Sequence, residues 1–415
     1  MRKLVTLKTI DDITPIEGAD RIETAHIGGW TIVVGKGDYY VGQKVFYFEP
    51  DAMLPLERNY FSFLRPRGVT TRDGKEYHRL KTAKLRGQIS QGIIFPQSIF
   101  DINWKAGWDE EAGFPRSKDG ESAYYDPDDA LDAMVDIREN HDGDFSEWFG
   151  VIKYEPVLPS EIKDKMLPFP EWINKTDEER IQNLEPETLE TILKDKENFI
   201  ATEKIDGTST TFFGKRDGDK MTFGVCSRNY EIIEDPTNIA WQKMDEKFIS
   251  NGETTISPRE FIASVLTNHE TCVLQGELYG EKIQKNPLGI VGTKIAFFNL
   301  YIDGEFIPLS KISDEYEYLL PYWVPIHNVE LPDNMEDIIK QPDGVYSLAR
   351  GAAKQRQIEG FVWRHSTKET IANNKIDLSK VPEENRETIA NSKACQPIRA
   401  SFKAISNKYL LKHED

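Results

Sequence analysis

A lysine between a strand-like run and a glycine turn is the residue of this sequence best suited to nucleophilic chemistry. Lys204 follows the short apolar run at 198–202 and precedes the turn pair Asp206-Gly207, and residues 208–213 are β-branched and aromatic. A lysine held at such a strand end is partly out of water, which disfavours its ammonium form. We therefore expect Lys204 to be an amine nucleophile with a lowered pKa.

Five further motifs follow this lysine along the chain. They are Ser227-Arg228-Asn229, Gly276-Glu277-Leu278-Tyr279-Gly280, Phe297-Phe298-Asn299, Glu359-Gly360-Phe361-Val362-Trp363-Arg364 and Ser401-Phe402-Lys403-Ala404. Together with the lysine, and in this order, they resemble the motifs of the covalent nucleotidyltransferases, which are the polynucleotide ligases and capping enzymes.

The resemblance implies a reaction and three catalytic residues. Lys204 would attack the α-phosphorus of ATP to give a covalent lysyl-AMP, and the AMP would pass to a 5′-phosphate before a 3′-hydroxyl displaces it. Lys403 would contact the α-phosphate, and its charge would further lower the pKa of Lys204. Glu359 would be a ligand for Mg²⁺ or Mn²⁺, since hard cations prefer carboxylate oxygens.

The same resemblance implies the remaining ATP-binding residues. Glu277 would contact the ribose hydroxyls, and Arg228 would hold a phosphate of ATP or of the RNA end. Phe298 would stack on adenine, with Phe297 as the alternative on the opposite face of the strand. Glu203 and Asp206, on either side of the nucleophile, complete the expected ATP-binding set together with Lys204, Glu359 and Lys403.

The elements that position these residues indicate an α+β chain of two domains. Residues 1–157 are expected to form an OB-type nucleic-acid-binding β-barrel with an acidic insertion at about 101–150. Residues 158–415 are expected to form an ATP-grasp-like nucleotidyltransferase domain of antiparallel sheets flanked by helices. Thr176 with Glu179 matches a capping box and predicts a short helix, and residues 345–356 have helical character.

Composition and length narrow the class of protein. The chain has 415 residues, 39% of them apolar, and no window approaches the length of a membrane span. The start of the sequence is typical of a strand rather than a signal peptide. The cysteine and histidine spacing indicates neither a disulfide framework nor a zinc site. We expect a cytoplasmic protein, monomeric and not bound to a membrane.

Charge is unevenly distributed along this acidic chain of net charge −18. Residues 65–86 contain eight basic and two acidic side chains, whereas residues 101–147 contain fifteen acidic and four basic ones. The basic stretch predicts phosphate contacts, and Lys81, Lys84 and Arg86 are the expected nucleic-acid-binding residues. The alternative is a solvated charged face.

Within the superfamily, the sequence looks like the Deinococcus-type ATP-dependent RNA ligases. The barrel precedes the lysine motif, and Ser209 stands where DNA ligases and capping enzymes typically carry arginine. That family implies RNA repair by sealing nicks in duplexes whose 3′-hydroxyl strand is RNA, so the expected partner is a nicked RNA or RNA/DNA duplex. Two alternatives stay open: a capping-type guanylyltransferase using GTP, and a non-catalytic RNA-binding protein on a ligase fold.

Overall fold

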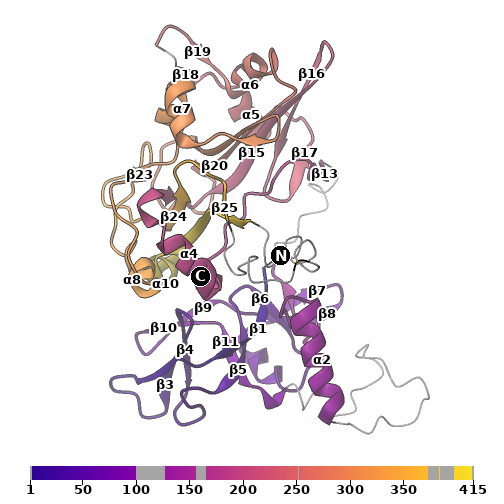
Figure 1. Ribbon diagram of the computed structural model, residues 1–415, viewed down its shortest axis with the longest axis vertical. Helices are drawn as coiled ribbons and strands as arrows, with labels where there is room; N and C mark the ends of the chain where they lie inside the picture. Colours follow the sequence, from indigo (N-terminus) through magenta and orange to yellow (C-terminus); the bar gives the residue numbers. More distant parts are fainter. Residues whose placement is uncertain are drawn as a thin grey trace, which may run out of the picture. The chain divides into compact units, whose positions relative to one another are not determined.

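The computed structural model describes residues 2–99, 127–155, 165–250, 252–372, 383 and 397–413, and Figure 1 draws it coloured along the chain. The chain divides into two compact units, Met1–Val157 with Leu411–Asp415, and Leu158–Leu410. Residues 101–126, the larger part of the expected acidic insertion, lie outside the described residues, as do 156–164 at the expected domain boundary.

The first unit is built from short antiparallel strands. They are β1 (Val5–Thr9), β2 (Asp12–Pro15), β3 (Ile22–Ile27), β4 (Trp30–Gly35), β5 (Lys44–Phe48), β6 (Ala52–Pro55), β7 (Thr70–Arg72), β8 (Lys75–Arg79), β9 (Thr82–Leu85), β10 (Gln88–Gln91), β11 (Ile93–Pro96) and β12 (Ile152–Lys153), with η1 (Ser62–Arg67) and α2 (Pro127–Asn140). They form the sheets β1-β5-β11, β2-β3-β4 and β12-β6-β8-β7 and the hairpin β9-β10.

Strand β5 lies at the centre of this unit and is buried on both faces. Phe46 and Phe48 pack in one apolar cluster, while Val45 and Tyr47 pack in the other. Side chains alternate along a strand, so the unbroken apolar run after Lys44 is what a strand with a core on each side requires.

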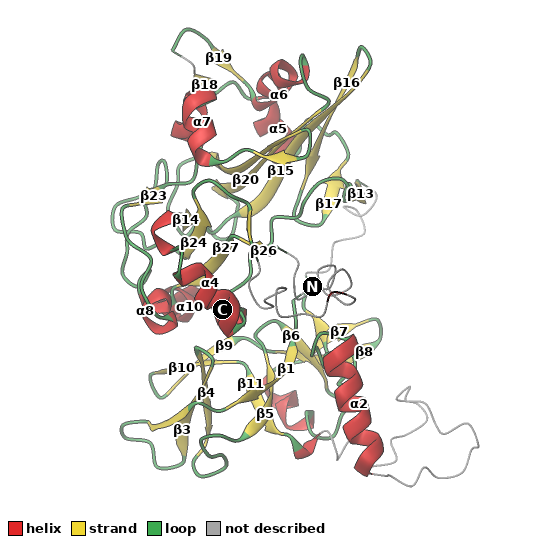
Figure 2. Ribbon diagram, in the orientation of Figure 1, coloured by secondary structure: helices red, strands yellow, loops and turns green. Residues whose placement is uncertain are grey.

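The second unit contains two larger sheets, two two-stranded sheets and several short helices (Figure 2). Its strands are β13 (Met166–Pro168), β14 (Phe199–Lys204), β15 (Thr208–Asp217), β16 (Lys220–Cys226), β17 (Tyr230–Ile232), β18 (Ile249–Ser250), β19 (Thr255–Ile256), β20 (Thr271–Gly280), β21 (Thr293–Ile302), β22 (Glu305–Phe306), β23 (Ile326–His327), β24 (Gly360–His365), β25 (Thr370–Ile371), β26 (Ile398–Arg399) and β27 (Ser401–Ile405). Its helices are η3 (Ile181–Asn183), α4 (Pro186–Leu193), η4 (Lys196–Asn198), α5 (Ile239–Asp245), α6 (Pro258–Leu266), α7 (Leu309–Glu315), η5 (Glu317–Tyr322), α8 (Met335–Lys340) and α10 (Asn407–His413). The two-stranded sheets are β18-β19 and β25-β26.

The larger sheet has the order β13-β17-β16-β15-β20-β21-β22, and its described pairings are antiparallel. Helix α6 begins with a complete capping box between Ser257 and Glu260. Its buried residues Phe261 and Ile262 share an apolar cluster with Phe212 of β15 and Leu274 of β20. The helix therefore closes the core on one face of this sheet.

The smaller sheet, β23-β14-β24-β27, has two chemically different faces. Phe361, Trp363 and Phe402 lie on the face that joins the apolar core. On the opposite face, the register places Thr202 beside Val362 and Val362 beside Lys403. Because strand residues two apart share a face, Lys204 also lies on this second face. The fold thus places the two predicted catalytic lysines, Lys204 and Lys403, on the same face of the smaller sheet.

Two expected helices are absent from the described structure. Thr176 does not cap a helix, because its hydroxyl pairs with Ser209 Oγ at 2.8 Å and residues 174–179 are irregular. Residues 345–356 are irregular as well, since Ser347 N donates to Arg356 O and the Glu203 carboxylate accepts a hydrogen bond from Leu348 N. In both segments, long-range hydrogen bonds replace the local ones that a helix would need.

None of the helices in the described ranges is both long and apolar enough to cross a membrane.

Candidate active site at the end of β14

Lys204 is the last residue of β14 and is partly buried. It lies opposite Gly360 in β24, so the residue before that strand, Glu359, is close to it. Lys204 Nζ donates a hydrogen bond to Glu359 Oε2 at 2.6 Å, and the two side chains are 28% and 16% exposed. The structure therefore brings the predicted nucleophile into contact with the predicted metal ligand.

The electrostatic surroundings of Lys204 differ from those expected. Burial disfavours its ammonium form, but the carboxylates of Glu359, Glu277 and Asp206 outweigh burial and raise the pKa of Lys204. The expectation of a lowered pKa is wrong, because the charges that act most strongly on Nζ are carboxylates rather than a neighbouring cation.

Glu277 and Asp206 are themselves perturbed. Burial raises the pKa of Glu277 to about 8, with a further increase from the charge of Glu359, while Lys204 opposes the shift. Burial also raises the pKa of Asp206, although Tyr409 opposes this by donating its hydroxyl hydrogen bond to Asp206 Oδ2 at 2.7 Å. The site thus holds one ammonium and three carboxyl groups at close quarters, an arrangement typical of functional sites.

Gly207 allows the nucleophile turn to lie against β20. A Cβ atom at this position would lie 2.4 Å from the carbonyl oxygen of Leu278 and 2.9 Å from Cγ of Glu277. The glycine of the Lys-x-Asp-Gly motif is therefore required by close backbone approach.

Phe298 occupies a β-bulge in β21. Gly276 pairs with Phe297 and Gln275 pairs with Asn299, which leaves Phe298 as the extra residue. Phe297 is fully buried in the core, whereas Phe298 is partly exposed. The guanidinium of Arg364 lies 5.3 Å from the Phe298 ring centroid. Of the two phenylalanines, only Phe298 is placed to meet a ligand.

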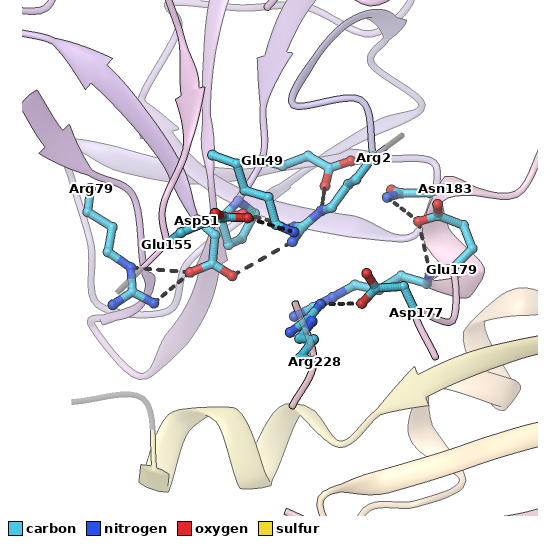
Figure 3. A network of polar contacts seen from close by, with 12 residues as sticks. Arg2, Glu49, Asp51, Arg79, Glu155, Asp177, Glu179, Asn183 and Arg228 are labelled. Carbon is cyan, nitrogen blue, oxygen red and sulfur yellow. Dashed lines mark hydrogen bonds and ion pairs between the residues drawn. The ribbon is translucent and has the colours of Figure 1, made fainter. Parts of the chain in front are cut away.

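Lys403 and Arg228 approach the site from other elements. Lys403 lies on β27 opposite Val362, on the same sheet face as Lys204. Arg228 follows β16, forms an ion pair with Asp177 (Figure 3), and opposes the rise in the pKa of Glu277 through its charge. Both positive charges therefore come from strands or strand ends of the same unit as Lys204.

Glu203 is the predicted site residue whose carboxylate the structure directs elsewhere. It is 2% exposed and accepts hydrogen bonds from His327 Nε2 at 3.1 Å, Leu348 N at 2.8 Å and the Ser347 hydroxyl. Its side chain lies on the opposite face of β14 from Lys204. It is therefore not brought together with the nucleophile, although its backbone is adjacent.

Sequence reasoning missed Glu178 and Tyr409. The Glu178 carboxylate accepts a hydrogen bond from Ser401 Oγ at 2.6 Å and lies 3.1 Å from nitrogen atoms of both Arg364 and Arg399. No local pattern connects these positions, so the sequence carries no signal for Glu178. Tyr409 has no signal beyond its place in the C-terminal segment, although its hydroxyl reaches Asp206.

Comparisons with known proteins agree with this geometry. Residues 197–381, which include Lys204, Glu277, Phe298 and Glu359, match the RNA ligase family model, and residues 4–97 match the model of an OB-fold domain. The chain is an RNA ligase.

Solved structures resemble this ligase over nearly its whole length. The Naegleria gruberi RNA ligase with PPi is 29% identical at a TM-score of 0.65, covering 100% of this chain and 99% of that one. A variant of that enzyme with AMP and Mn is 28% identical at a TM-score of 0.66, covering 99% of each chain. Another variant, with ATP and Mn, is 28% identical at a TM-score of 0.65, and the match covers 99% of each chain. A search of curated protein sequences found no match.

The ligase's first unit is the OB-fold domain, and the expected fold class is confirmed. Lys81, Lys84 and Arg86 are exposed around the β9–β10 hairpin, and none forms an ion pair with another described residue. By contrast, Arg79 is bound to Asp51 at 2.6 Å (Figure 3). The three predicted residues are therefore among the basic side chains of this stretch that can still bind a ligand.

Among the described residues, no group of three or more histidine, cysteine, aspartate or glutamate side chains is placed to hold a metal ion. Mg²⁺ commonly keeps several waters and takes only one or two protein carboxylates together with substrate phosphates. Glu359, whose carboxylate already binds the Lys204 ammonium, fits such a partial set of ligands.

Proposed function

We propose that this ligase joins an RNA 3′-hydroxyl to a 5′-phosphate through a covalent AMP on Lys204, formed from ATP. The observation that carries the proposal is the position of Lys204 Nζ, 2.6 Å from Glu359 and influenced by the charges of Glu277 and Asp206. A surface lysine would not be held at a strand end among three carboxyl groups. The ATP and AMP in structures of the Naegleria enzyme support ATP as the nucleotide.

The first step makes the enzyme adduct. The Lys204 ammonium, which donates a hydrogen bond to Glu359 at 2.6 Å, must first lose a proton to solvent. The free amine then attacks the α-phosphorus of ATP, so that a nitrogen–phosphorus bond forms while the bond to the bridging oxygen breaks and pyrophosphate leaves.

Two displacements at phosphorus follow. An oxygen of the RNA 5′-phosphate attacks the AMP phosphorus, which breaks the nitrogen–phosphorus bond and regenerates the lysine. The 3′-hydroxyl then loses its proton to solvent and attacks the activated 5′-phosphate, and AMP leaves with the electron pair of the phosphoanhydride bond that breaks. In-line reactions of this kind depend mainly on positioning and on neutralising phosphate charge.

The other predicted residues have roles consistent with their positions. Lys403 supplies positive charge for the α-phosphate from the face that it shares with Lys204. Arg228 holds a further phosphate. Phe298 stacks on adenine from its bulge, and Glu203 contributes through its backbone, because its carboxylate is engaged elsewhere.

Glu277 suits a ribose contact because of its protonation state. With a pKa of about 8, its carboxyl is largely protonated at neutral pH. A protonated carboxyl both donates and accepts hydrogen bonds, whereas a carboxylate only accepts them. It can therefore donate a hydrogen bond to a ribose hydroxyl or accept one from it, without adding negative charge beside the phosphates.

Glu359 would hold Mg²⁺ or Mn²⁺, which supplies positive charge to the phosphate oxygens when bound. With its carboxylate engaged in this way, Glu359 would stabilise the Lys204 ammonium less. Burial, which lowers the pKa of Lys204, would then meet less opposition. Asp206, held by the Tyr409 hydroxyl, would remain in place beside the nucleophile.

The natural substrate we propose is a nicked duplex with RNA on the 3′-hydroxyl side, and the role is RNA repair by a monomer inside the cell. The OB-fold domain ahead of the catalytic unit supports a Deinococcus-type ligase, and Lys81, Lys84 and Arg86 are its proposed duplex contacts. Such domains bind nucleic acids through loops and a strand face.

Sealing assays on the full-length protein test this proposal. Four nicked duplexes, with RNA or DNA on each side of the nick, are incubated with ATP or GTP and Mg²⁺. We expect sealing with ATP whenever the 3′-hydroxyl strand is RNA. Protein labelling by GTP alone would instead support a capping enzyme, and no adduct with either nucleotide would support a non-catalytic RNA-binding protein.

A further inference from the structure

A basic surface on the catalytic unit is not used by the chemistry above. It consists of residues 281–294 and 345–357, called here the two-loop surface. These segments contain six basic residues and one acidic residue, Glu281, in a chain of net charge −18. The basic residues are Lys282, Lys285, Lys294, Arg350, Lys354 and Arg356. Such a concentration in an acidic protein indicates an anionic partner.

The charges of this surface are open to solvent and not neutralised. Lys294 is partly buried and the other five side chains are exposed. None of the six forms an ion pair within the part of the chain that the structure describes. Elsewhere in the same unit, Arg259 is bound to both Asp245 and Glu234. The guanidinium of Arg350 lies 4.6 Å from the Tyr322 ring centroid. The charges of the two-loop surface are therefore not neutralised by carboxylates of the described residues and can attract an anion.

Hydrogen bonds hold the two segments together as one surface. Ala353 N donates to Leu288 O at 2.9 Å and so joins the two segments directly. The Tyr279 hydroxyl, at the end of β20 just before the first segment, donates to Arg350 O of the second at 3.3 Å. Asn286 fixes its own loop through two hydrogen bonds with Ile290. The surface is thus organised before any ligand arrives, which reduces the entropy lost on binding.

The same surface is attached to both neighbours of the nucleophile. The carboxylate of Glu203 accepts a hydrogen bond from Leu348 N, and Ile205 packs in a cluster that includes Leu288 and Ala349. Because side chains alternate along a strand, Glu203 and Ile205 face away from Lys204, and the two-loop surface is attached to the opposite side of the nucleophile's strand.

Exposed apolar side chains lie among these charges. Val291 is 83% exposed, Leu348 is 61% exposed and Tyr346 is 53% exposed. Combining basic side chains with an exposed aromatic is typical of surfaces that bind a strand through both its phosphates and its bases. A purely acidic protein partner would have less use for the apolar positions.

We propose that the two-loop surface binds phosphates of the RNA substrate on the catalytic unit. This inference rests on the proposed function, and it adds a second RNA contact, on the catalytic unit, to the one expected on the OB-fold domain. The bound polymer is RNA, recognised mainly through its backbone.

Charge-removal variants of the full-length protein test the inference. One double variant carries Lys282→Ala and Lys285→Ala, and another carries Lys354→Ala and Arg356→Ala. The matched control carries Lys215→Ala and Lys220→Ala, two exposed lysines of the β15–β16 hairpin without ion pairs among the described residues. Affinity for nicked RNA is measured at several salt concentrations, together with adduct formation from ATP and sealing.

We expect both surface variants to bind RNA several-fold more weakly and to seal more slowly, while adduct formation and melting match the wild type. The slope of log affinity against log salt should become shallower by about one unit for each RNA phosphate that the variant no longer neutralises. Affinity and slope equal to those of the wild type, or a decrease equal to that of the control, would overturn the inference. Failure of the wild type to form an adduct or to seal would instead overturn the proposed function.

Discussion

Burial of Glu277 lowers the free energy of unfolding by an amount that depends on pH. Its pKa is raised from the ordinary value of 4.5 to about 8 in the folded protein. Below pH 4.5 the carboxyl is protonated in both the folded and unfolded states. Between pH 4.5 and about pH 8, the Glu277 carboxyl is ionised in the unfolded state but still protonated in the folded state. The free energy of unfolding therefore falls as the pH rises through this window.

Glu277→Gln should therefore stabilise the ligase at alkaline pH. The amide stays neutral, so the variant loses this contribution to the pH dependence. Thermal melting should show near-equal stability at pH 5 and an advantage for the variant, on the order of a few kcal/mol, at pH 9. A difference that does not change with pH would mean that Glu277 is ionised like an exposed carboxylate.

At the scale of elements, strand register explains which site residues could be predicted. Lys204 and Glu277 lie at or near strand ends marked by turns and glycines, so their placement follows from local patterns. Phe298 depends on a bulge produced by pairing with β20, and Glu203 is drawn away by residues more than a hundred positions distant. Local sequence carries no information on either arrangement.

The bulge gives the adjacent residues Phe297 and Phe298 different surroundings, and this difference can be tested. Phe298→Ala should raise the KM for ATP by about tenfold, because base stacking contributes about 1 to 3 kcal/mol, with little change in melting temperature. Phe297→Leu is the matched control, since Phe297 is fully buried in the core. It should lower the melting temperature and leave the KM nearly unchanged. The reverse pattern would reassign the adenine contact to Phe297.

At the scale of the whole molecule, the order of the motifs predicted the catalytic unit, because each motif lies on its own strand or strand end. The OB-type barrel was predicted separately, from the short strand-like runs that precede the motifs. The prediction of a helix at 345–356 was wrong. The composition of this segment favours a helix, but Ser347 N donates to Arg356 O and Leu348 N donates to the Glu203 carboxylate, and these bonds hold the segment in an irregular conformation. Glu178 could not be foreseen, because its partners Arg364 and Arg399 follow it by about two hundred residues.

The OB-fold domain should contribute to RNA binding but not to adduct formation. A full-length variant with Lys81→Ala, Lys84→Ala and Arg86→Ala should form the ATP adduct normally and seal nicks poorly. Its salt slope for duplex binding should be shallower by about three units if all three side chains contact phosphates. Lys36→Ala with Lys44→Ala, both exposed in the same unit, serves as the control. An unchanged slope would make the basic stretch a solvated face.

The most direct test of the proposed chemistry is to map the adduct formed with labelled ATP. Lys204→Arg is the informative variant, because it keeps a positive charge beside Glu359, Glu277 and Asp206, whereas alanine would leave three carboxyl groups unopposed. Wild-type protein should carry one AMP on the peptide containing Lys204, and the variant should carry none while melting near the wild-type temperature. An adduct on another residue, or on the arginine variant, would contradict the assignment of Lys204 as the nucleophile.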